Sequence, residues 1–388
     1  MVGLAAARVD RGFPGRPAAS RGDGAGRYRD PVPVPPDAPF LAACRNRPAS
    51  RVPVWFMRQA GRSLPEYRAL RGVGTILDAV KDPALATEIT LQPVRRYGVD
   101  AAILYSDIVV PVAALGFGVD VQQGVGPVVE RPFVDEADLD RLRPLDPDAD
   151  CAYVQDTVRQ VVAELGDIPL IGFAGAPFTV ASYLIEGGPS RTLGRTKALM
   201  LGRPDLWERL LDRLADVAIA SLRAQVAAGA SAIQLFDSWA GSLSPDLYER
   251  AVLPASAKVF AALAPEGVPA IHFGVDTGEL LPLLAKAGAD VVGVDWRVPL
   301  DEARRRLGPD VAVQGNLDPA ACLAPWPAVE ERARDVLARN GGRPGHVFNL
   351  GHGVLPETDP ATLERLVELV HAAPAPTAAP PSPGPVAP

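Results

Sequence analysis

Residues 53–62, PVWFMRQAGR, contain the unit that decides the fold: a short apolar run that ends in a polar loop and is followed by helix-like sequence. Short runs that are rich in Val, Ile and Phe and bounded by Gly, Pro or Asp are typical of buried β-strands. The pattern recurs along the chain. The eight predicted strands cover residues 53–57, 101–105, 169–173, 232–236, 269–273, 291–295, 311–314 and 347–350.

Amphipathic sequence separates these runs. Apolar residues recur at three-to-four spacing in residues 205–228, and residues 328–340 have a similar pattern, so both stretches are predicted helices. Strands that alternate with helices form a parallel sheet, and eight of them favour a closed (β/α)8 barrel of the TIM type. A doubly wound open sheet is the alternative. It would more often have a Gly-rich phosphate loop after its first strand, and RQAGR has too few glycines for that.

The segment between the second and third predicted strands is long. Residues 116–132, GFGVDVQQGVGPVVERP, alternate apolar and polar side chains around a Gly-rich turn. Such alternation indicates a β-hairpin. We expect this hairpin to be inserted near the barrel mouth.

Composition divides the chain into a body and two tails. Residues 1–36 are rich in Gly, Pro, Ala and Arg, and residues 373–388 are almost entirely Ala, Pro, Ser and Gly. Both segments lack the apolar periodicity of a core and are predicted to be disordered tails. The N-terminal arginines weakly suggest a transit peptide, but the Asp, Gly and Pro content favours a tail. One barrel domain is therefore expected over residues 37–372.

Charge and cysteine content exclude several classes of function. The net charge of −7 argues against a nucleic-acid or anionic-membrane surface, and no apolar run is long enough to span a bilayer. Cys44, Cys151 and Cys322 are far apart and have no metal-ligand spacing, so neither a disulfide framework nor a zinc site is indicated. Reduced thiols in a cytoplasm are expected.

Polar residues follow the predicted strands, and in barrels of this type the active site lies at that end of the strands. Two arginines, Arg58 and Arg62, follow the first strand, and Asp107 follows the second. Two guanidinium groups in one loop suit a substrate with several carboxylates, because each can bind one bidentately. Gly61 lets the backbone approach a ligand closely. A buried Asp107 would need a cation or N–H donors facing it.

Five stretches of this sequence resemble the uroporphyrinogen decarboxylase family. They occur in the right order within residues 37–372, and RQAGR followed by GAPFT and GHG is much more specific than a lone Gly-rich loop. The stretches are PVWFMRQAGRSLPEYRALR at 53–71, YSDIVVP at 105–111, GFAGAPFTVASYLIEGG at 172–188, LFDSWAG at 235–241 and NLGHGVLPET at 349–358.

The resemblance implies an enzyme of haem and porphyrin biosynthesis. It would remove CO2 from the four acetate side chains of uroporphyrinogen III to give coproporphyrinogen III, as a cytoplasmic homodimer without cofactor or metal. Asp107 would be the essential carboxylate and would accept the pyrrole N–H groups, with Arg58 or an ordered water as proton donor. The implied substrate-binding residues are Arg58, Gln59, Ala60, Gly61, Arg62, Asp107, Tyr183, Ser238 and His352.

Five of these residues also have a purely structural interpretation. Arg58 and Arg62 would be salt-bridge partners, because most charged side chains are solvated or paired. Asp107 and Ser238 would cap helices. Tyr183 would be a core aromatic with a satisfied hydroxyl.

Two other functions fit the same barrel. The first is a zinc-dependent corrinoid or thiol methyltransferase, since one fold can host many chemistries. Such enzymes bind zinc with a His and Cys pair near the fifth strand, whereas here Phe273 and Gly274 follow His272. The second is a non-catalytic tetrapyrrole-binding barrel, which would need a degraded site.

Overall fold

A parallel sheet forms the centre of the computed structural model, which describes residues 34–72, 74–122 and 124–377. Its strand order is β1-β4-β5-β6-β7-β8-β9, and every pair of neighbours is parallel. All seven strands overlap predicted runs, with ends that differ by no more than three residues. The strands are β1 (Ala102–Ile103), β4 (Leu170–Gly175), β5 (Ala232–Asp237), β6 (Ala270–Gly274), β7 (Val291–Gly293), β8 (Ala312–Gln314) and β9 (His346–Val347).

The remaining predicted strand, residues 53–57, closes the sheet. Val54 forms a parallel bridge with Phe348, next to β9. On the other side, the Asp100 N–H, just before β1, donates to the Val54 carbonyl at 2.8 Å. The segment therefore lies between the two edge strands, and the (β/α)8 barrel is confirmed. This segment forms an isolated bridge rather than a regular strand, because a side chain binds a backbone group that would otherwise pair with a neighbouring strand. The Val54 N–H donates to the Asp100 carboxylate at 2.8 Å.

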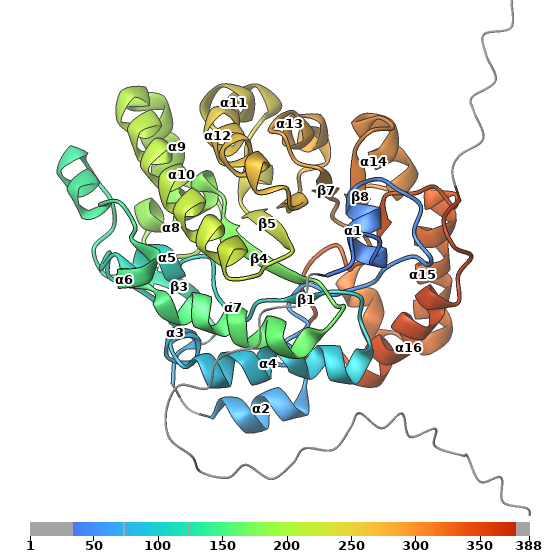
Figure 1. Ribbon diagram of the computed structural model, residues 1–388. Helices are drawn as coiled ribbons and strands as arrows, with labels where there is room; N and C mark the ends of the chain where they lie inside the picture. Colours follow the sequence, from blue (N-terminus) through green and yellow to red (C-terminus); the bar gives the residue numbers. More distant parts are fainter. Residues whose placement is uncertain (1–33, 73, 123, 378–388) are drawn as a thin grey trace, which may run out of the picture.

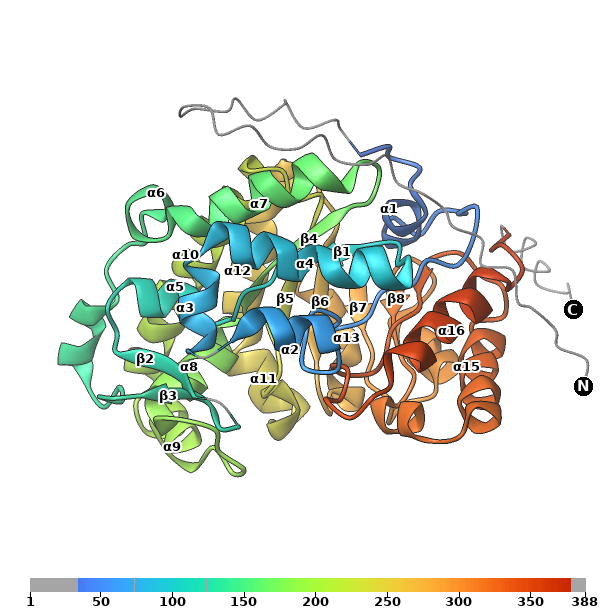
Figure 2. The same cartoon turned by 90° about the horizontal axis from the view of Figure 1, so that it is seen from below.

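Helices cover the outside of the barrel (Figures 1 and 2). The predicted helix over 205–228 is α10, which buries Leu206, Leu210 and Leu214 against the sheet. The helices are α1 (Pro39–Cys44), α2 (Pro65–Arg71), α3 (Ile76–Val80), α4 (Pro83–Tyr97), α5 (Val110–Ala114), α6 (Pro147–Asp150), α7 (Ala152–Leu165), α8 (Pro177–Glu186), α9 (Gly194–Gly202), α10 (Pro204–Ala227), α11 (Pro245–Ala251), α12 (Leu253–Leu263), α13 (Leu281–Lys286), α14 (Leu300–Leu307), α15 (Trp326–Asn340) and α16 (Pro360–His371).

The predicted hairpin is present as β2 (Val119–Gln122) and β3 (Gly126–Val129), which pair antiparallel. It packs against the C-terminal end of α8: the Val129 N–H donates to the Gly187 carbonyl at 2.9 Å. Figure 2 shows the two strands beside α8 and α5. Because α8 follows β4, the hairpin lies beside the barrel mouth.

The described helices and strands run from Pro39 to His371. Most of the two predicted tails, residues 1–33 and 378–388, lies outside the described residues. Within the described part of the chain, no helix has both the length and the apolar character needed to cross a membrane.

Candidate active site

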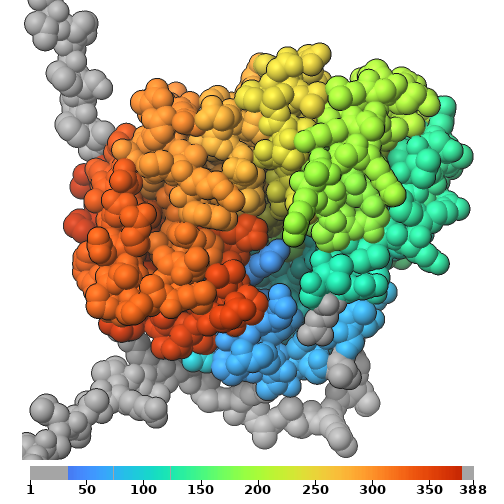
Figure 3. All heavy atoms as spheres, turned by 180° about the vertical axis from the view of Figure 1, so that it is seen from behind, coloured from blue at the N-terminus to red at the C-terminus, as the bar shows by residue number. Residues whose placement is uncertain are grey.

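The loops after the strands bring the predicted site residues together at one end of the barrel. Arg58 lies close enough to Asp107, Tyr183 and His352 to act on all three electrostatically. Burial raises the pKa of Asp107 and Tyr183 and lowers the pKa of His352, and the charge of Arg58 lowers all three pKa values. Figure 3 shows the surface hollowed where N-terminal residues, in blue, meet the green, yellow and orange segments.

The backbone around Arg58 is held on both sides. Arg58 has a φ of 59°, a left-handed conformation that is uncommon outside glycine. The preceding residue, Met57, donates its N–H to Asn349 Oδ1 at 3.0 Å, and its carbonyl accepts the Val354 N–H at 2.8 Å. The segment after β9 therefore fixes the end of the first strand and the direction of Arg58.

Two glycines make room for this arginine. A Cβ on Gly353 would lie 2.7 Å from Arg58 Cγ, closer than side chains pack, so the Arg58 side chain lies directly across Gly353. A Cβ on Gly61 would lie 2.8 Å from the Arg58 carbonyl oxygen. Gly61 of the RQAGR motif and Gly353 of the GHG motif are therefore needed because any side chain there would clash with Arg58.

The loop 58–62 does not present all of its side chains to the mouth. Gln59 is fully buried: its Oε1 accepts the Phe56 N–H at 3.0 Å and its Nε2 donates to the Ala101 carbonyl at 3.1 Å. Its side chain therefore connects the loop to the first predicted strand, residues 53–57, and to the residue before β1. Ala60 and Gly61 are half-buried and Arg62 is exposed.

The salt-bridge interpretation of the two arginines finds no support within residues 34–377. Among the described ion pairs of the chain, none includes Arg58 or Arg62. Both side chains are exposed, and neither has a carboxylate partner among the described residues.

Asp107 is half-buried and only partly satisfied. Its Oδ1 accepts the Val109 N–H at 3.1 Å, a local bond in the turn before α5. Burial raises the pKa of this carboxyl, while the Val109 N–H and the nearby Arg58 oppose that rise. A buried carboxylate of this kind gains from N–H donors or positive charge supplied by a ligand.

Tyr183 and Ser238 come from adjacent loops. Tyr183 is half-buried on α8 and its ring meets Trp239 edge-on at 5.7 Å between centroids. Ser238 is half-buried after β5, and the next residue, Trp239, donates its N–H to Thr179 Oγ1 at 3.2 Å. A threonine from α8, rather than Ser238, therefore caps this turn.

His352 lies between the two glycines of GHG, with its ring 6.4 Å from that of Phe273. Burial and, to a smaller extent, the positive charge of Arg58 together lower the pKa of His352 to about 4. The imidazole is neutral near pH 7. It can therefore donate one hydrogen bond to a ligand carboxylate without carrying charge.

A buried polar network lies beneath the β5 loop. Asp237 is fully buried and accepts the Thr179 hydroxyl at 2.8 Å and the Tyr248 hydroxyl at 3.5 Å. His272 Nε2 lies 3.8 Å from the Asp237 carboxylate, while its Nδ1 is 3.2 Å from the Leu284 carbonyl oxygen. His272 thus belongs to the support of the Ser238–Trp239 turn.

Sequence reasoning missed residues that position the site without facing it. Asn349 and Gly353 orient Arg58, and Thr179 and Asp237 hold the turn that contains Ser238. All four lie within the motifs quoted above. Their residue types and positions in the sequence do not distinguish them from core residues, and only their contacts in the structure do.

Comparison with known proteins gives a consistent result. Residues 35–373 match the family model described as Uroporphyrinogen decarboxylase (URO-D). Uroporphyrinogen decarboxylase of Salinispora tropica is 62% identical over 337 residues, which are 87% of this chain and 91% of that protein. The enzyme of that name from a Mycobacterium species is 58% identical over 346 residues, 87% of this chain and 98% of that protein.

A solved structure of a methyltransferase from Methanosarcina mazei is also similar. It superposes with a TM-score of 0.71 and 20% identity, and the match covers 87% of this chain and 98% of that one. At this identity the likeness shows a shared fold only.

Proposed function

The chain belongs to the uroporphyrinogen decarboxylase family, and on that premise we propose how the residues at its barrel mouth carry out the reaction. The family consists of cofactor-independent carboxy-lyases of porphyrin and haem biosynthesis. The reaction removes CO2 from the four acetate side chains of uroporphyrinogen III and gives coproporphyrinogen III. The observation that carries the proposal is the grouping of Arg58, Asp107, Tyr183 and His352 around one mouth.

The chemistry begins with a proton. Protonation of the pyrrole carbon that bears the acetate makes the ring a cation and an electron sink. The bond to the carboxylate then breaks, CO2 leaves, and its electron pair enters the ring. A second proton reaches the exocyclic carbon as the ring proton is lost. One proton therefore replaces each CO2.

Asp107 stabilises the cationic ring in this scheme. Its carboxylate accepts the pyrrole N–H groups, which supply the donors that the protein leaves open. Burial strengthens its attraction for the positive charge that develops in the transition state. The raised pKa of Asp107 in the free protein is expected to fall when the cationic ring forms beside it.

Arg58, or a water that it holds, donates the proton, because the Arg58 side chain lies across Gly353 and beside Asp107. Arg62 is exposed on the same loop and binds a peripheral carboxylate. Tyr183, Ser238 and neutral His352 complete the binding surface with uncharged hydrogen-bonding groups. Ala60 and Gly61 are small, so the backbone of the loop can lie close to the substrate. The buried Gln59 side chain keeps the loop in place.

We also propose a cytoplasmic homodimer. Cys44, Cys151 and Cys322 are buried free thiols, which suits a reducing compartment. Family membership is the reason to expect the dimer. Sedimentation at micromolar concentration should give a species of about twice the subunit mass. A species of 40.8 kDa alone would contradict the dimer.

The direct test is incubation with enzymatically generated uroporphyrinogen, followed by chromatography of the oxidised products. Coproporphyrin should accumulate, with chelator present or absent. Activity that disappears with chelator and returns with zinc would overturn this scheme in favour of metal-dependent chemistry.

A further inference from the structure

An arginine after β7 is anchored at the mouth but has no part in the scheme above. Arg297 Nη1 lies 2.8 Å from the carboxylate of Asp295, whose side chain is only 2% exposed. The guanidinium also stacks over the Trp296 ring at 4.2 Å from its centroid. A buried carboxylate and an aromatic face together fix the guanidinium plane, yet its side chain remains 43% exposed.

The loop that carries Arg297 lies against the GHG segment. A Cβ on Gly351 would lie 3.0 Å from the Asp295 carbonyl carbon, so the two backbones are in direct contact. The pKa of His352 is lowered first by burial, and the charges of Arg58 and Arg297 both contribute to the lowering. Arg297 is thus a neighbour of a residue already placed in the binding surface.

The second acidic partner of Arg297 is loosely held. Asp276 Oδ1 lies 3.6 Å from Arg297 Nε, beyond good hydrogen-bond distance, and its side chain is 68% exposed. An exposed pair of this kind contributes little stability. The contacts to Asp295 and Asp276 are through Nη1 and Nε, and no hydrogen bond of Nη2 occurs among the described residues. A carboxylate that arrived from solvent would find one edge of the guanidinium open.

We propose that Arg297 binds a peripheral carboxylate of the substrate on the β7 side of the mouth, and that Asp276 competes with that carboxylate for it. The inference rests on the function proposed above, because it needs a substrate with several carboxylates. Arg58 and Arg62 both lie after the first strand, so a polycarboxylate that fills the mouth would gain from a cation elsewhere on the rim. Buried Asp295 positions this one in advance.

Two substitutions separate binding from a merely structural role. Arg297→Gln removes the charge and should raise the KM for uroporphyrinogen about tenfold with kcat within about threefold, since one charge-assisted contact is lost. Asp276→Asn removes the competing carboxylate and should lower KM below that of the wild type. If the three side chains only clamp neighbouring loops together, both substitutions should impair the enzyme alike.

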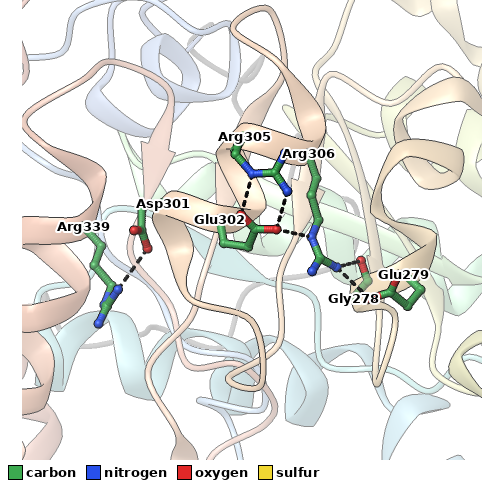
Figure 4. A network of polar contacts seen from close by, with 7 residues as sticks. All are labelled: Gly278, Glu279, Asp301, Glu302, Arg305, Arg306 and Arg339. Carbon is green, nitrogen blue, oxygen red and sulfur yellow. Dashed lines mark hydrogen bonds and ion pairs between the residues drawn. The ribbon is translucent and has the colours of Figure 1, made fainter.

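Controls make each outcome decisive. Arg305 on α14 is 73% exposed and pairs with Glu302 in a surface network outside the mouth (Figure 4), so Arg305→Gln should keep the wild-type KM. Arg297→Lys keeps the charge and should have a KM between those of wild type and Arg297→Gln. It also serves if the glutamine variant does not fold.

The inference fails if Arg297→Gln keeps the wild-type KM, or if Asp276→Asn does not lower KM. Wild-type protein that yields no coproporphyrinogen in the same assay would instead overturn the proposed function. The two failures are therefore distinguishable.

Discussion

Arg58 shows how single residues create this site, because its orientation is set by residues that are not among the predicted ligand-binding residues. The Met57 N–H bond to Asn349 fixes the backbone before it, and the absent side chain of Gly353 leaves the space that its own side chain fills. The charge of Arg58 then acts on Asp107 and His352 together. A site in which one cation serves two partners depends strongly on the position of that cation.

Gly353→Ala should therefore displace Arg58. The new Cβ would meet the flexible Arg58 side chain, which can swing away, so folding should change little. The loss of an oriented cation should lower kcat on the order of a hundredfold. Steady-state kinetics and thermal unfolding measure the two effects.

Gly202 provides the matched control, because a Cβ there meets no atom within 4 Å. Gly202→Ala should have wild-type kinetics. Normal kcat in Gly353→Ala would show that the direction of Arg58 is unimportant.

Arg62→Lys should behave differently, because lysine keeps the charge but loses the bidentate fork. If Arg62 binds a peripheral carboxylate, KM should rise and partly decarboxylated intermediates should be released, with kcat less affected. Chromatography of the products at early times would detect the intermediates. Arg334→Lys on α15, which alters an exposed pair with Glu330, is the control. A product pattern identical to wild type would argue against this role.

At the scale of elements, the alternation of strands and helices could be predicted because each buried strand is a continuous apolar run between turn residues. The first predicted strand is the one that forms only an isolated bridge in the structure. Residues 53–57 look like the others in sequence, but the Asp100 carboxylate and the Asn349 amide take its backbone bonds. Such hydrogen bonds connect positions far apart in the chain, so no local sequence pattern predicts them.

The candidate site was predictable only in part, for a related reason. Loop residues after strands converge by topology, so Arg58, Asp107 and His352 could be grouped from sequence. Which way a side chain points could not be inferred. Gln59 belongs to the same motif as Arg58 yet turns into the protein, and Arg297 gains its place from a buried partner two residues earlier.

The junction between β8 and β9 should make stability sensitive to pH. His346 is fully buried, with Nε2 2.8 Å from the Gly315 carbonyl oxygen, and burial lowers its pKa from 6.5 to about 4. Between these values the unfolded chain binds a proton that the folded chain excludes, so stability falls as the pH drops from 6.5 towards 4.

His346→Gln should reduce that loss. Urea unfolding of both proteins at pH 7 and pH 5 gives the comparison, and other titrating groups cancel between them. An equal loss of stability in wild type and variant would show that His346 does not contribute.

At the scale of the whole molecule, the catalytic barrel should be independent of the chain ends. A chain trimmed to residues 34–377 contains the expected 37–372 domain and keeps two terminal contacts, Arg47 with the Pro36 carbonyl and Thr377 with the Gly342 carbonyl. Low-complexity termini carry few buried contacts, so kcat and KM should equal those of the full chain. A large loss of activity in the trimmed protein would assign the ends a role.

The distribution of charge is also a property of the whole molecule. The chain has a net charge of −7, yet its mouth contains several arginines and a half-buried carboxylate. The proposed site therefore suits a ligand whose carboxylates reach the arginines and whose centre suits Asp107. A ring that carries acidic groups outside and N–H groups inside has that character.

The central claim is that Asp107 stabilises a cationic ring in the transition state, and kcat of Asp107→Asn tests it most directly. Asparagine keeps the size and one acceptor oxygen but removes the charge. For correctly folded variant, kcat should fall by on the order of a hundredfold or more, with a much smaller change in KM. A kcat close to that of the wild type would contradict the claim and leave the arginines and solvent to supply the stabilisation.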